Sequence, residues 1–175
     1  MGSADFLEAL GAVITLDGPQ TAAVVDGCGF GFLFAPMFHP AMKHVAAVRK
    51  QLGVRTVFNL LGPLTNPTRP KYMVVGVGSR DLGPLFAELF RLRQAERILV
   101  MHSTDGVDEI SIAADTLVWE VTPDGITERT ISPVADFGLA ATSPLDAVCG
   151  GTPAERAAAF RAVLAGTNKV VASSK

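Results

Sequence analysis

The middle of the chain alternates between two hydrophobic patterns. Lys71 to Val77 (KYMVVGV) and Arg97 to Met101 (RILVM) are short apolar runs with β-branched residues, which is typical of buried strands. Between these runs, residues 82–95 place leucine and phenylalanine at intervals of three and four, as on the buried face of a helix. A strand, a helix and a strand within about 30 residues predict a βαβ unit with parallel strands.

A second pair of strands is predicted further along the chain. Residues 116–121 and 126–131 have the length and composition of strands, and they flank the sequence Pro123-Asp124-Gly125. A turn of this type between two such segments predicts an antiparallel hairpin. Together with the βαβ unit, the hairpin predicts the α/β fold class, with a mixed, largely parallel sheet flanked by helices.

Helix signals occur near both ends of the chain. Thr152 suits an N-cap, Pro153 the first helical position and Gly166 the residue after a helix. Near the other end, Ser3 suits the N-cap of a helix that Gly11 ends. The helices predicted outside the βαβ unit are residues 4–10, 19–28, 41–52 and 152–165.

The remaining segments are short or irregular. Residues 12–16 (AVITL) predict a short strand, and Asp17-Gly18-Pro19 predicts a turn. Residues 29–35 form a further apolar segment, after which His39 lies in a loop between two prolines. Residues 55–70 predict a short helix or turn followed by a long ordered loop.

The chain contains no internal repeat and no low-complexity linker. Its 175 residues are enough to bury a hydrophobic core as a single unit. We therefore predict one α/β domain over residues 1–168, followed by a disordered tail over residues 169–175.

Composition and charge narrow the function classes. Hydrophobic residues make up 49% of the chain and charged residues 18%, which indicates either a large core or a surface that meets a partner. The net charge of -2, without a cluster of basic residues, argues against nucleic-acid binding. No apolar run approaches the roughly 20 residues of a membrane span, and the N-terminus lacks signal-peptide features. Two widely spaced cysteines, Cys28 and Cys149, favour a reduced, cytoplasmic protein.

The stretch HSTDGVDEIS places acidic side chains directly after a predicted strand. Asp105 lies in a turn with Gly106, and Asp108 and Glu109 are adjacent. Ligands in α/β proteins bind at the carboxyl ends of strands, and Mg²⁺ prefers oxygen ligands that it shares with substrate phosphates. The residues thus suggest a magnesium site, and a solvated acidic turn is the alternative.

Two further stretches contain candidate binding groups. Arg49 follows His39 by ten residues, so both could face one cleft, where an arginine can pair with a carboxylate. The alternative is an arginine that offsets the dipole at a helix C-terminus. Residues 59–66 (NLLGPLTN) could line a pocket for a planar apolar ligand, or form an ordinary helix stop. Gly76-Val77-Gly78 is too short for a dinucleotide fingerprint, and no nucleophile-elbow pattern occurs.

Three collinear stretches carry a family resemblance: GSADFLEALG, then GFLFAPMFHPAMKHVAAVRKQLGVRTVFNLLGPLTNP, then MHSTDGVDEIS. Together they resemble the anthranilate phosphoribosyltransferases, glycosyltransferases of tryptophan biosynthesis, from about residue 2 to residue 168. The resemblance implies the large α/β domain that this family shares with nucleoside phosphorylases. It also implies the reaction of phosphoribosyl pyrophosphate with anthranilate, which gives N-(5-phosphoribosyl)anthranilate and pyrophosphate.

The resemblance also assigns roles to individual residues. Asp108 and Glu109 match the family's magnesium-binding pair, which makes Mg²⁺ the expected cofactor. Arg49 matches an anthranilate-binding arginine, and His39 and Pro63 match positions that line the anthranilate channel. Ser3 matches a serine that contacts phosphoribosyl pyrophosphate. No residue is assigned as a catalytic acid, base or nucleophile.

The family also has parts that do not occur in these 175 residues. They are an N-terminal helical domain, through which members form homodimers, and GTGGD, NxST and KHGN loops that contact the diphosphate. We therefore expect a truncated large domain with little or no activity alone, for which the family dimer is not predicted. The alternatives are a non-catalytic remnant, a partner of a full-length copy, or a relative of pyrimidine nucleoside phosphorylases.

Overall fold

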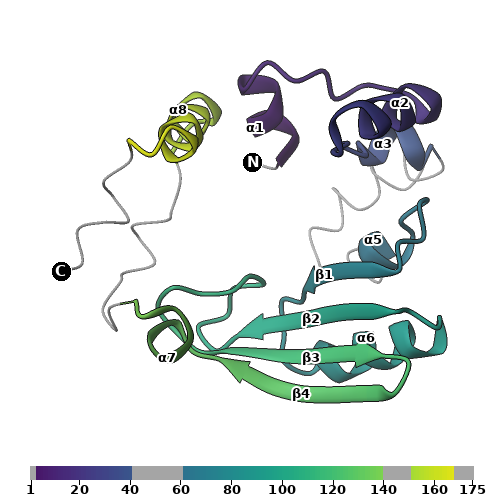
Figure 1. The fold of residues 1–175 in the computed structure, drawn as a ribbon, viewed down its shortest axis with the longest axis vertical. Coiled ribbons are helices and arrows are strands. Elements are labelled where there is room, and N and C mark those ends of the chain that lie inside the picture. Colours follow the sequence, from purple (N-terminus) through teal and green to yellow (C-terminus); the bar gives the residue numbers. More distant parts are fainter. Residues whose placement is uncertain (1–2, 41–60, 140–150, 168–175) are drawn as a thin grey trace, which may run out of the picture. The chain divides into compact units, whose positions relative to one another are not determined.

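The computed structural model describes residues 3–40, 61–139 and 151–167 of the chain (Figure 1). Its contacts group into two compact units. The first unit takes in Met1–Pro67 and Gly150–Lys169, and the second takes in Thr68–Cys149 and Val170–Lys175. Each unit is described by itself. The single domain predicted over residues 1–168 therefore stays a prediction.

A four-stranded sheet forms the centre of the second unit, in the order β1-β2-β3-β4 (Figure 1). The strands β1 and β2 are parallel, whereas β2 with β3 and β3 with β4 are antiparallel. The βαβ unit, the hairpin and the mixed α/β class are thus confirmed. Among the described strands, parallel pairing is limited to β1 and β2. The elements are β1 (Tyr72–Gly76), α6 (Leu82–Leu92), β2 (Arg97–Ser103), β3 (Thr116–Thr122) and β4 (Gly125–Ile131).

Helix α6 packs on one face of this sheet. Its residues Phe86 and Phe90 are buried, as the three-and-four spacing predicted. Contact with the sheet is close at Gly83, where an added Cβ would lie 2.2 Å from the ring of Trp119. Beneath the helix, Ile98 and Val121 are fully buried. Because glycine has no Cβ, the helix can approach the ring of Trp119 at position 83.

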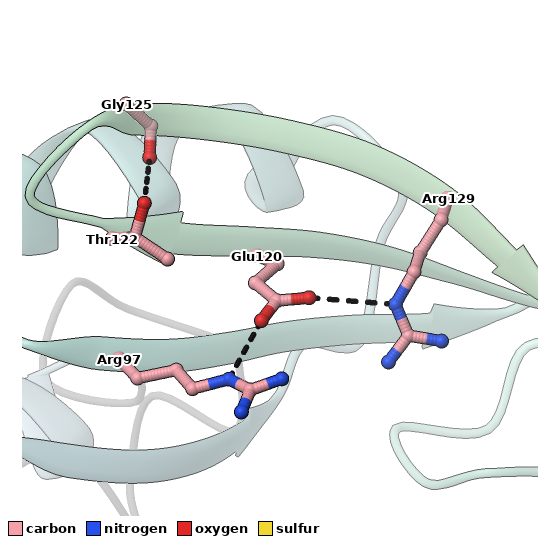
Figure 2. Close-up of polar contacts among 5 residues, drawn as sticks. All are labelled: Arg97, Glu120, Thr122, Gly125 and Arg129. Atoms are coloured by element: carbon pink, nitrogen blue, oxygen red, sulfur yellow. Dashed lines mark hydrogen bonds and ion pairs between the residues drawn. The ribbon is translucent and has the colours of Figure 1, made fainter.

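The opposite face of the sheet combines an apolar cluster with an ionic ladder. Met101, Val118 and Ile131 are buried together. Two strand positions away from Val118, Glu120 binds an arginine on each neighbouring strand (Figure 2). Its Oε1 lies 2.6 Å from Nε of Arg97, and its Oε2 lies 3.5 Å from Nε of Arg129. The ladder therefore links β2, β3 and β4 across one face.

The chain closes the hairpin with a two-residue turn and then forms a helix that the sequence analysis did not predict. Gly125 has a φ of 142°, and its carbonyl oxygen accepts a 3.5 Å hydrogen bond from the Thr122 hydroxyl (Figure 2). Helix α7 (Pro133–Phe137) follows, with Ser132 as its N-cap and Gly138 as its left-handed C-cap. These caps were readable in the sequence, but a helix of five residues has no apolar periodicity to reveal it.

The first unit is helical where it is described. Its elements are α1 (Ser3–Ala9), α2 (Gly18–Cys28), α3 (Ala35–Phe38), α5 (Leu61–Leu64) and α8 (Pro153–Leu164). Helices α1 and α8 pack together through an edge-to-face contact of Phe6 and Phe160, with ring centroids 5.3 Å apart. Helix α8 is confirmed, and Thr152 and Glu155 cap it reciprocally.

Some local predictions in the first unit are wrong. Ser3 lies inside α1 rather than before it, and α3 occupies part of the predicted loop around Pro36. The predicted turn at Asp17 is instead a capping box, in which Asp17 accepts a hydrogen bond from the backbone N–H of Gln20. Residues 12–16 form no strand, because a short strand needs a neighbouring strand and the described sheet contains only β1 to β4.

Several predictions fall on residues outside the described part. They are the helix over 41–52 with Arg49, the start of the 55–70 segment, Cys149 and the tail over 169–175. Cys28 is described, and it is an exposed free thiol. No helix among the described residues combines the length and the apolar character that a membrane crossing requires.

Candidate functional site

The acidic loop, residues 104–115, connects the end of β2 to the start of β3. Backbone hydrogen bonds hold it at both ends. The N–H of Ser103 donates to the carbonyl of Val107 (3.0 Å), and the N–H of Thr104 donates to the carbonyl of Asp115 (2.9 Å). Gly106 forms the predicted tight turn with a φ of 93°. The loop is therefore folded back on itself at the carboxyl end of β2.

Asp105 is bound inside this loop. Its carboxylate accepts a hydrogen bond of 2.6 Å from the Ser111 hydroxyl and a longer one of 3.4 Å from the Val107 N–H. The Ser111 hydrogen bond is the main reason that the pKa of Asp105 lies below its ordinary value. Asp105 is thus a structural carboxylate, which separates it from the two acidic residues that follow.

Ser111 is the buried centre of the network. Its hydroxyl oxygen also accepts hydrogen bonds from the N–H groups of Ala113 (2.9 Å) and Ala114 (3.2 Å). Its own N–H donates to the hydroxyl of Thr116, the first residue of β3, at 3.2 Å. Both Ser111 and Thr116 are buried. The sequence analysis missed these hydroxyl groups, although serine and threonine on both sides of an acidic turn were a readable signal.

Asp108 and Glu109 have a different environment. Both side chains are exposed, and no other described residue makes a hydrogen bond or ion pair with their carboxylates. Two adjacent carboxylates repel each other, so a nearby cation would stabilise both. Their oxygen atoms are the hard ligands that Mg²⁺ prefers.

The donor set fits a metal ion that is shared with a substrate. No group of three or more His, Cys, Asp or Glu residues able to hold a metal occurs in the part of the chain that the structure describes. Mg²⁺, however, is commonly held by only one or two carboxylates together with substrate phosphates and water. Asp108 and Glu109 match that arrangement.

Gly76, the last residue of β1, brings the acidic loop against the sheet. An added Cβ at Gly76 would lie 1.7 Å from the carbonyl oxygen of Asp108. The backbone of Asp108 therefore packs directly on the carboxyl end of β1, beside the carboxyl end of β2. Next to this contact, Nδ1 of His102 lies 2.8 Å from the carbonyl oxygen of Val77 and fixes the chain where β1 ends. This edge of parallel strands is where ligands bind in α/β proteins.

The other predicted site residues lie in the first unit or outside the described residues. Ser3 is exposed in the first turn of α1. His39 is half-buried at the C-cap of α3, where its N–H donates to the carbonyl of Ala35 at 2.9 Å. Pro63 is half-buried in α5. Arg49 lies outside the described residues. Asp108 and Glu109 are thus the predicted site residues that lie in the second unit.

Comparison with known proteins identifies the family. The sequence model of the glycosyl transferase family, a/b domain, matches residues 1–174 of this chain.

The chain belongs to this family.

Two similar curated proteins share one name. A protein of Herpetosiphon aurantiacus named anthranilate phosphoribosyltransferase is 46% identical over 168 residues, which are 95% of this chain and 49% of the relative. The protein of that name from Haloarcula marismortui is 48% identical over 165 residues, 94% of this chain and 49% of the relative. The resemblance stated from the sequence is therefore confirmed. The chain spans about half the length of these curated relatives.

Solved structures give the same result for the fold of the glycosyl transferase domain. Anthranilate phosphoribosyltransferase from Saccharomyces cerevisiae in complex with PRPP and Mg has a TM-score of 0.86 at 31% identity, over 95% of this chain and 47% of that one. The same yeast enzyme in complex with 4-fluoroanthranilate has a TM-score of 0.87 with the same identity and coverage.

Proposed function

We propose that this chain serves in the transfer of a phosphoribosyl group from phosphoribosyl pyrophosphate to anthranilate, in tryptophan biosynthesis. The names of its relatives support this proposal, as do the ligands of the similar yeast structures. The observation in this chain that carries it is the pair of exposed carboxylates of Asp108 and Glu109, which no other described residue binds, at the carboxyl edge of parallel strands.

The reaction needs charge stabilisation more than proton transfer. The amine nitrogen of anthranilate forms a bond to C1 of the ribose, the bond from C1 to the diphosphate oxygen breaks, and the amine loses a proton. Positive charge develops on the ribose ring and negative charge on the leaving diphosphate. A magnesium ion held at this site would supply neutralisation of that negative charge. Asp108 and Glu109 are the residues of this chain that would hold the metal.

The remaining roles follow the family resemblance. We assign Arg49 to the carboxylate of anthranilate, because a guanidinium group can donate two parallel hydrogen bonds to a carboxylate. His39 and Pro63 are assigned to the anthranilate channel, and Ser3 to the phosphoribosyl donor. A cytoplasmic location stays a prediction, and no dimer of this chain alone is predicted.

Calorimetric titration of phosphoribosyl pyrophosphate into the 175-residue chain tests the proposal, with and without Mg²⁺. We expect binding that depends on Mg²⁺ and that weakens by about tenfold or more in Asp108→Asn and in Glu109→Gln. Asp115→Asn is the matched control. It removes one charge from the same loop, at an exposed carboxylate that no other described residue binds. Binding that is independent of Mg²⁺, or an equal loss in all variants, would contradict the metal assignment.

The choice of acceptor is tested by the same titration. With Mg²⁺ and the phosphoribosyl donor present, we expect heat on addition of anthranilate and none on addition of uridine or thymidine. The opposite preference would favour the pyrimidine nucleoside phosphorylase alternative. No binding of either compound, with donor binding also absent, would favour a non-catalytic remnant.

A further inference from the structure

Gly76 belongs to a Gly-Val-Gly sequence that is too short for a dinucleotide fingerprint, and it makes a very close backbone contact. A Cβ at this position would lie 1.7 Å from the carbonyl oxygen, 2.7 Å from the carbonyl carbon and 3.1 Å from the Cβ of Asp108. A Cβ atom essentially never approaches an atom outside its own and the adjoining residues within 3.0 Å. Two of the three neighbours are backbone atoms, so no flexible side-chain end can move aside.

The requirement for glycine at position 76 is one of space and not of backbone conformation. Gly76 lies in a regular strand, paired with Met101, and it is not among the residues with positive φ. Glycine weakens a strand, and in a strand interior it often marks a close approach of a ligand or another backbone. Here the approaching group is the backbone of Asp108, the first residue of the proposed metal-binding pair.

Neither side of this contact can easily yield. On one side, Gly76 is held in the β1–β2 ladder. On the other side, the loop is held before and after Asp108. The carbonyl of Val107 accepts from the N–H of Ser103, and Ser111 is bound to Asp105 and to Thr116. A side chain at position 76 must therefore displace Asp108 or open the loop.

We propose that Gly76 is a positioning residue, which sets the location of the Asp108 and Glu109 carboxylates at the edge of the sheet. This inference rests on the proposed magnesium role of the pair. Metal ligands must be held within about half an ångström of their working geometry, and Gly76→Ala moves Asp108 by more than this if the strand stays in place.

The test compares Gly76→Ala with Gly83→Ala in the 175-residue chain. The control is the same substitution in the same unit, and its Cβ also meets a close obstacle, the ring of Trp119 under α6. Both variants should lose stability. Amide NMR should show the changes of Gly76→Ala concentrated at residues 107–111, and those of Gly83→Ala around α6 and β3. Mn²⁺, measured by electron paramagnetic resonance, should bind about tenfold more weakly to Gly76→Ala and with unchanged affinity to Gly83→Ala.

The outcomes separate this inference from the proposed function. If Asp108→Asn weakens Mn²⁺ binding but Gly76→Ala does not, or if the amides of residues 107–111 are unchanged, the positioning role is wrong. If wild type and Asp108→Asn bind Mn²⁺ alike while those amides move, the metal function fails and the control of the loop by Gly76 stands.

A double variant covers the case in which Gly76→Ala does not fold. Ser111→Ala removes the side-chain anchor of the loop, so that the loop can move away from an alanine at position 76. Addition of Ser111→Ala should therefore restore part of the stability lost in Gly76→Ala without restoring Mn²⁺ affinity. Purely additive losses of stability, or a double variant that folds no better than Gly76→Ala alone, would show that the alanine does not act through the loop.

Discussion

The hydroxyl of Ser111 lies 2.6 Å from Oδ2 of Asp105 and donates a hydrogen bond to it across the acidic loop. This bond gives two carboxylates of similar sequence context different roles. The Asp105 carboxylate accepts a hydrogen bond within the loop. The Asp108 carboxylate has no partner among the described residues and can therefore bind a ligand.

Ser111→Ala should destabilise the chain by about 1–2 kcal/mol, because it removes the hydroxyl that donates to the Asp105 carboxylate and accepts from the N–H groups of Ala113 and Ala114. Urea unfolding measures the loss. Thr104→Ala is the matched control, since the exposed Thr104 hydroxyl makes no hydrogen bond with described residues. Equal losses in the two variants would refute the importance of Ser111.

The contribution of Asp105 to stability should depend on pH. The pKa of Asp105 is lower in the folded chain than in the unfolded chain, where it is about 4. The stabilisation is therefore fully present above the unfolded-state pKa, and it is lost as the pH falls through the folded-state pKa. The difference in unfolding free energy between wild type and Asp105→Asn should therefore shrink below about pH 4. A difference that stays constant from neutral to acid pH would contradict this assignment.

The cap of α8 gives a prediction for the first unit. Thr152 Oγ1 accepts from the N–H of Glu155 at 3.3 Å, and Glu155 Oε2 accepts from the N–H of Thr152 at 2.7 Å. Thr152→Ala should cost about 1 kcal/mol of stability, and Thr152→Ser should cost much less because it keeps the hydroxyl. Thermal unfolding compares the two variants, and equal melting temperatures would show that the cap hydroxyl contributes nothing.

The ladder around Glu120 should contribute little and should respond to salt. The carboxylate is mostly covered, but Arg97 and Arg129 remain 59% and 44% exposed. Glu120→Gln should therefore cost no more than about 1 kcal/mol, and less in high salt, because exposed ion pairs are screened. A larger loss that salt does not change would show that the ladder behaves as a buried ion pair.

The sequence predicted those parts of the fold that repeat with a regular period. The segments around Val75, Phe86 and Val100 have strand or helix periodicity, and their burial agrees with it. The apolar run around Ile14 was misassigned because length and composition cannot show whether a partner strand is present. The cap at Asp17 is readable from Gln20 three residues later, but the Gly-Pro pair between them equally predicts a turn.

The candidate site was only partly predictable for a similar reason. The adjacency of Asp108 and Glu109 is visible in the sequence, and so is their position after a strand. The bond from Ser111 to Asp105 and the contact of Gly76 with Asp108 depend on how the loop folds back on the sheet. No local pattern encodes that return, so the sequence alone does not distinguish Asp105 from Asp108 or reveal the contact made by Gly76.

Paramagnetic broadening of amide signals by Mn²⁺, in the presence of pyrophosphate, tests the central claim most directly. The signals of residues 107–110 should disappear first at low Mn²⁺ in the wild-type chain, and Asp108→Asn should remove the effect while Asp115→Asn retains it. Broadening centred elsewhere, or spread evenly over all exposed carboxylates, would contradict a magnesium-diphosphate site at Asp108 and Glu109.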